Sequence, residues 1–221
     1  MTREAFWDVA RASDGAALPG LPVRAVADDA GLVAVASGTL AAVEGALATL
    51  STLAPGGAAA ALAEAFARLP DGAEVVALLF RAGGAALAQR GQHRALALRD
   101  GRLLTLTSEQ SACESLAVVR EGLRLEPTAD LAAAAASRAA LPAEALGFLR
   151  AVAARATEVR ALEAAPGTRY LVLSHTACRA LGHDVLWQLA EARCGARAVV
   201  EAARRANPAQ RRGMGAAVVQ V

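Results

Sequence analysis

Three side chains near residue 180 have the residue types of a metal site or a thiol nucleophile. His175, Cys178 and His183 lie within one short segment. Zinc sites use about four nitrogen or sulfur ligands, and no second Cys-x-x-Cys or His-x-x-x-His pair completes this set. A nucleophilic thiol would need a carboxylate to orient its histidine, and only Asp184 is close in sequence. Both sites stay open as alternatives, and a small core residue is the simpler interpretation of Cys178.

A second group of polar residues introduces a short hairpin. Gln92, His93 and Arg94 precede an apolar strand, and Asp100-Gly101 separates that strand from the next one. An Asp-Gly pair between two apolar segments is a strong hairpin signal. The sequence therefore predicts a β-hairpin entered through these three polar residues.

Four polar positions, one of them His175 again, stand in short motifs along the chain. They are Glu4 in Thr-Arg-Glu-Ala-Phe, Ser37 in Val-Ala-Ser-Gly, His175 in Leu-Ser-His-Thr, and Arg212 just before the last apolar segment. Ser37 and His175 each follow an apolar strand pattern, so both are expected at strand ends.

In this order the segments resemble the metal-dependent Ser/Thr protein phosphatases of type 2C, the PPM family. The family motifs read Asn-Glu-Asp-x-Phe, Val-Ala-Asp-Gly, Gly-Asp-Ser-Arg-Ala, Ser-Asp-Gly and Asp-Asn-x-Thr. The resemblance extends over nearly the whole chain, but the acidic positions of these motifs are changed. They are held here by Glu4, Ser37, Gln92, His175 and Arg212. By this resemblance the chain looks like a degenerate member, a pseudophosphatase.

The resemblance implies an α+β fold, a four-layer α-β-β-α sandwich of two antiparallel sheets flanked by helices. Residues 1–221 are expected to form it as a single domain. Family members hold Mg²⁺ or Mn²⁺ with Asp oxygens, and the ions activate a water. Hard cations need anionic oxygen ligands, whereas Ser37 offers a neutral hydroxyl, His175 a nitrogen and Arg212 a positive charge. We therefore expect no catalytic residue, no metal and no cofactor.

The function expected from this resemblance is regulatory or scaffolding, through protein–protein contacts. A kinase, a phosphoprotein or a component of a secretion machinery would be a natural partner. The alternative is a residual metal-dependent Ser/Thr phosphoprotein phosphatase with an altered metal site, in which Glu4, Asp28, Asp29 or another unmatched acid holds one metal. A third, weaker interpretation is a structural subunit whose Ala-rich helices build an oligomer.

The substitutions also suggest a site for phosphate. If Arg94, His175 and Arg212 converge, the former metal site becomes cationic and could bind a phosphorylated Ser or Thr without hydrolysing it. The simpler alternative is an ion pair between Arg212 and Glu4 that fills the site.

Hydrophobic periodicity, punctuated by Gly and Pro, predicts the elements that position these residues. Strands are expected over residues 31–36, 74–80, 85–89, 95–98, 102–107, 158–163, 170–173 and 216–221. Helices are expected over residues 39–50, 58–69, 108–120, 130–140, 143–155, 184–193 and 196–206. Tight turns between successive strands favour an α+β domain with antiparallel sheets.

Composition limits the remaining possibilities. The net charge is +2 and aromatic residues make up 3% of the chain, which argues against nucleic acid as a partner. No apolar run reaches the roughly 18 residues of a membrane span, and no signal peptide follows Met1. The 3 cysteines are irregularly spaced, which favours a reducing compartment. A cytoplasmic bacterial protein of undetermined oligomeric state is therefore expected.

Overall fold

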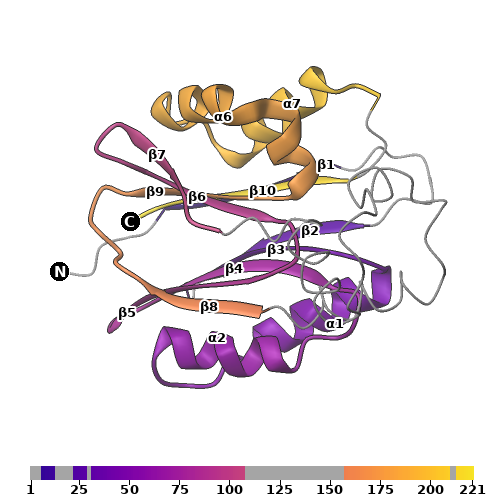
Figure 1. The fold of residues 1–221 in the computed structure, drawn as a ribbon, viewed down its shortest axis with the longest axis vertical. Helices are drawn as coiled ribbons and strands as arrows, with labels where there is room; N and C mark the ends of the chain where they lie inside the picture. The colour runs from indigo at the N-terminus through magenta and orange to yellow at the C-terminus, as the bar shows by residue number, and fades with distance from the viewer. Residues whose placement is uncertain (1–5, 13–21, 29–30, 108–156, 210–212) are drawn as a thin grey trace, which may run out of the picture.

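The computed structural model describes residues 6–12, 22–28, 31–107, 157–209 and 213–221. Within them, two antiparallel five-stranded sheets stack face to face, and a pair of helices covers the outer face of each (Figure 1). The first sheet has the order β1 (Phe6–Ala12), β10 (Met214–Gln220), β9 (Arg169–Leu173), β6 (Arg94–Arg99) and β7 (Arg102–Thr105). The second has the order β2 (Val23–Ala27), β3 (Leu32–Ser37), β4 (Glu74–Arg81), β5 (Gly84–Arg90) and β8 (Thr157–Leu162).

The helices form the two outer layers. Helices α1 (Leu40–Ser51) and α2 (Ala58–Ala67) cover the second sheet, and α6 (His175–Glu191) and α7 (Ala196–Ala206) cover the first. This arrangement confirms the predicted α+β fold, a four-layer α-β-β-α sandwich. None of the helices in the described part of the chain is long and apolar enough to cross a membrane.

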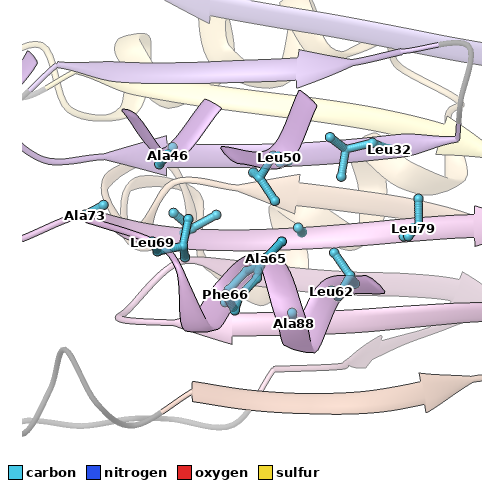
Figure 2. Close-up of a cluster of buried hydrophobic side chains, with 14 of the residues drawn as sticks. Leu32, Ala46, Leu50, Leu62, Ala65, Phe66, Leu69, Ala73, Leu79 and Ala88 are labelled. Carbon is cyan, nitrogen blue, oxygen red and sulfur yellow. The ribbon is translucent and has the colours of Figure 1, made fainter. Parts of the chain in front are cut away.

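The alternation of side chains along each strand divides the core into three layers. In β4, Val76 and Leu78 belong to the cluster between the two sheets, whereas Val75 and Leu79 face α1 and α2. Figure 2 shows the latter cluster, in which Phe66 reaches from α2 towards the sheet. Strands that are apolar on both faces are therefore sandwiched between a helix layer and the other sheet.

The β6–β7 hairpin forms where the sequence predicts it. Arg99 pairs with Arg102, and the two residues between them, Asp100 and Gly101, have φ angles of 51° and 71°. Positive φ at both central positions is typical of a type I′ turn, which matches the twist of the flanking strands. Helix α6 is tied to this hairpin: Trp187 Nε1 donates to the Gly101 carbonyl (2.9 Å), and a ring nitrogen of His183 lies 3.3 Å from the Leu103 carbonyl oxygen.

Most predicted elements within the described ranges are present, with ends shifted by a few residues. The helix predicted over residues 184–193 is an exception, because α6 begins at His175 and only breaks at Gly182, where φ is 69°. Ser174 starts it: the hydroxyl accepts from the Ala177 N–H (3.3 Å), and such a cap begins a helix without a long apolar pattern. Strands β1 and β2 were not predicted. The helices predicted between residues 108 and 155 lie outside the described residues.

Candidate functional site

Four of the predicted site residues lie at one end of the sandwich. Ser37, the last residue of β3, pairs with Glu74, the first residue of β4. The Glu74 carboxylate accepts from the Gln92 N–H (3.3 Å), and Arg94 begins β6 opposite Leu173. The N–H of His175 donates to Nδ1 of His93 (3.1 Å). Ser37, Gln92, Arg94 and His175 are thereby connected through backbone pairing and hydrogen bonds, whereas Glu4 and Arg212 lie outside the described residues.

Residues 91–93 form the crossover between the two sheets, because they link β5 to β6. Gln89 of β5 stabilises this crossover, because its side-chain amide donates to the carbonyls of Gly91 (2.8 Å) and His93 (3.3 Å). Gly91 has a φ of 97°, and a Cβ on it would lie 2.7 Å from Cγ of Glu74. Only glycine lets the crossover pass this close to the Glu74 side chain.

His93 is buried at the centre of the site, with 2% of its surface exposed. Because Nδ1 accepts a hydrogen bond from a backbone N–H, the neutral ring carries its proton on Nε2. The pKa of His93 is lowered from 6.5 to about 3, chiefly because burial disfavours the charged ring and also because His175 and Arg94 lie near it. The backbone of Glu74 acts in the opposite direction. His93 is therefore neutral at physiological pH.

Ser174 fixes the other side of the site. Its hydroxyl is fully buried and accepts from the N–H groups of Ala177 (3.3 Å) and Gly215 (3.1 Å), and its own N–H donates to the Gly215 carbonyl (2.9 Å). It thus joins the end of β9, the start of α6 and the start of β10. Ser174 and Glu74 were not singled out from the sequence. The Ser before a His-Thr-Ala segment is an N-cap signal that could have revealed Ser174, whereas nothing local marks Glu74.

The predicted site residues that the structure describes at this end do not suit a pair of Mg²⁺ or Mn²⁺ ions. Ser37, Gln92 and His175 supply a hydroxyl, an amide and an imidazole, and none of them supplies the anionic oxygen that hard cations require. Glu74 does carry a carboxylate, and it accepts a hydrogen bond from Gln92. Across the described ranges, no three His, Cys, Asp or Glu side chains are grouped so that they could hold a metal.

The structure gives little support to a zinc site or a thiol nucleophile on α6. His175, Cys178 and His183 are all described, and they do not form a metal-binding group. Cys178 is a reduced, partly buried residue that packs against the apolar cluster under α6 and α7, in agreement with a core role. The ring of His183 contacts the Leu103 carbonyl on the β6–β7 hairpin instead.

The fold of this chain is similar to that of proteins whose structures have been solved. No family model matches the chain, and no curated protein matches it. Several solved structures do match the chain. The serine/threonine phosphatase PstP/Ppp of Mycobacterium tuberculosis matches with a TM-score of 0.65 and 22% identity, over 98% of each chain. The catalytic domain of PstP in complex with two manganese ions matches with a TM-score of 0.64 and 22% identity, over 98% of this chain and 99% of that one.

A third match is PppA, a regulatory component of the type VI secretion system in Pseudomonas aeruginosa. Its TM-score is 0.67 at 19% identity, over 98% of this chain and 99% of that one. At these identities the likeness concerns the fold. The chain therefore has the fold of the PPM (type 2C) Ser/Thr protein phosphatases.

Proposed function

We propose that this protein is a catalytically inactive relative of the type 2C phosphatases, a pseudophosphatase that acts through protein–protein contacts. The observation that carries the proposal is the donor set at the strand ends, where Ser37, Gln92 and His175 occupy positions at which the family motifs have Asp. A two-metal phosphatase needs its ions to lower the pKa of the attacking water and to neutralise the phosphoryl group. Neutral donors bind such ions weakly, so neither role can be filled.

The surrounding contacts support this proposal. The carboxylate of Glu74 accepts from Gln92, and the Nδ1 lone pair of His93 accepts from His175. Nδ1 of His93 has a single lone pair, so while it accepts from His175 it cannot also act as general base or metal ligand.

The role that we propose is regulatory and cytoplasmic. The partner would be a kinase, a phosphoprotein or a component of a secretion machinery. The structural similarity to a regulatory component of a secretion system supports the last of these. A cationic site formed by Arg94, His175 and Arg212 would let such a protein hold a phosphorylated Ser or Thr. An Arg212–Glu4 ion pair would instead close the site.

The enzymatic part is tested with p-nitrophenyl phosphate and a phosphoserine peptide in the presence of Mn²⁺. We expect no metal-dependent turnover from the wild-type protein. The matched comparison is the quadruple variant Ser37→Asp, Gln92→Asp, His175→Asp and Arg212→Asp, which restores the acidic motif residues. Robust Mn²⁺-dependent turnover by the wild type would refute the proposal and establish a residual phosphatase with an altered site.

The binding part is tested separately. Peptide binding is measured by isothermal titration for the wild type and Arg212→Ala, with the unphosphorylated peptide as control. Binding that requires the phosphate and is lost in Arg212→Ala would support phosphate recognition. Absence of binding by the wild type would refute it, and affinity capture from the native cell with mass spectrometry would then be needed to identify a partner of another kind.

A further inference from the structure

At the end of the sandwich that carries the site, the chain crosses from one sheet to the other. Only residues 91–93 connect β5 of one sheet to β6 of the other, and the polypeptide must pass between two stacked sheets there. Strand ends from both sheets meet at this point, with Ser37 and Glu74 on one side and Ser174 on the other. Val23, the strand partner of Ser37, belongs to the apolar cluster between the sheets and lies beside Gly213 and Gly215. Apolar contact therefore reaches this end, and the polar residues there add hydrogen bonds to it.

Besides the two hydrogen bonds from Gln89 of β5, the crossover bonds to β4 and to the start of α6. On the side of β4, the Glu74 carboxylate accepts from the Gln92 N–H (3.3 Å). On the side of β9 and α6, Nδ1 of the buried His93 accepts from the His175 N–H (3.1 Å). His175 is the first residue of α6, so this bond satisfies an N–H that has no partner within the helix. The two consecutive residues Gln92 and His93 therefore link the two sheets through one hydrogen bond each.

The charges at this point do not call for a cation. A ring of Asp side chains is mutually repulsive and is relieved by bound ions. Ser37, Gln92 and His175 carry no negative charge, and the one carboxylate beside them, that of Glu74, accepts a hydrogen bond from Gln92. We propose that the Glu74–Gln92 and His93–His175 hydrogen bonds hold this end of the sandwich in place of metal ions, and that folding is independent of divalent cations. This inference rests on the proposed loss of the metal centre.

The first test compares thermal unfolding of the wild-type protein in excess MnCl₂, in MgCl₂ and in EDTA, followed by circular dichroism. We expect the same Tm in all three. A Tm several degrees higher in MnCl₂ than in EDTA would overturn the inference, because a cation that stabilises the folded state must bind it.

The second test isolates the His93–His175 bond. His175→Pro removes the donating N–H, and proline is tolerated at the first residue of a helix. Ser174 has φ −62° and ψ 149°, a conformation that a following proline favours. His175→Ala removes the same ring but keeps the N–H, so it is the matched control. We expect His175→Pro to unfold about 3–6 °C below His175→Ala, and this difference to vanish when His93→Ala is added to both.

The third test uses the acceptor. His93→Ala removes Nδ1 and should lower Tm by roughly 5–10 °C, and His93→Asn, whose amide oxygen can take the place of Nδ1, should recover at least half of that loss. His183→Ala, which removes a more exposed imidazole and its contact with the Leu103 carbonyl, is the comparison and should lower Tm less than His93→Ala. Equal Tm values for the proline and alanine variants of His175 would overturn the inference. So would an NMR spectrum that shows the His93 proton on Nδ1.

The outcomes separate this inference from the proposed function. Stabilisation by Mn²⁺ without turnover would refute the inference and leave the proposed inactivity standing. Turnover with Mn²⁺ would refute the inactivity and the independence from cations together, whereas the Tm difference between His175→Pro and His175→Ala in EDTA would still test the hydrogen-bonded link.

Discussion

Strand β4 takes part in two regions of different physical character. In its middle, Val76 and Leu78 are fully buried in the cluster between the two sheets, among Val, Leu, Ala and Tyr side chains. At its first residue, Glu74 lies opposite Ser37 and accepts a hydrogen bond from Gln92. The middle is held by apolar contact, which has no preferred direction. The end is held by a few hydrogen bonds, each of which needs a particular donor and a particular acceptor.

This difference means that residue types at the polar end can vary without loss of the fold. Most of the buried residues in the described chain belong to the apolar clusters between the sheets and under the two helix layers. The polar end can therefore exchange residue types as long as its backbone groups find partners. In the described chain Glu74, His93 and Ser174 provide those partners.

Truncation in the middle should have the largest effect. Leu78→Ala removes a fully buried side chain between the sheets and leaves a cavity that the stacked strands cannot close. We expect a loss of about 4 kcal/mol in the free energy of unfolding, measured by urea denaturation. A loss below about 1 kcal/mol would mean that the cluster between the sheets is looser than the structure shows.

A methyl group at the crossover should cost somewhat less. Gly91→Ala combines an unfavourable φ of 97° with a Cβ 2.7 Å from Cγ of Glu74. We expect a loss of roughly 2–3 kcal/mol in urea denaturation. Gly101→Ala is the matched control, since its φ of 71° is also positive but nothing lies within 4 Å of the added Cβ. If both variants lose the same amount, contact with Glu74 contributes nothing.

Acidification should weaken the polar end through His93. The folded-state pKa of His93 is about 3, below the ordinary 6.5, so between these values the unfolded chain binds a proton that the folded chain does not. The free energy of unfolding therefore decreases as pH falls through this window, by about 2 kcal/mol at pH 5. His93→Asn should make this decrease smaller. An unchanged pH dependence in His93→Asn would show that other groups cause it.

The smallest effects are expected from the helix caps. Ser174→Ala should destabilise by about 1–2 kcal/mol, because it removes a buried acceptor for both Ala177 and Gly215. Thr39→Ala removes the cap of α1, whose exposed hydroxyl accepts only from Ala42 (3.2 Å), and should cost about 1 kcal/mol or less. Urea denaturation of the two variants in parallel checks the order. The reverse order would contradict the role of Ser174 in joining β10 to α6.

Periodicity and turn chemistry were sufficient for the elements with strong local signals. The Asp100-Gly101 turn, the apolar strand β9 and helix α7 were all predicted close to their observed positions. Strands β1 and β2 were not predicted. Strand β2 is a five-residue edge strand whose residues are all partly exposed. Arg24 stands at its second position, so the hydrophobic pattern of this strand is weak. It is a strand because β3 offers it a complete antiparallel register, which is a tertiary contact.

For the site, the sequence by itself determined the residue types, and hence that Ser37, Gln92 and His175 bring no negative charge. It also determined the hairpin and the strands that carry them. Only the tertiary structure decided that His93 meets the N–H of His175, 82 residues away, and that Glu74 meets Gln92. Such contacts depend on the stacking of two sheets, which brings strand ends together across long stretches of chain. A local pattern encodes the strands but not which of their ends will touch.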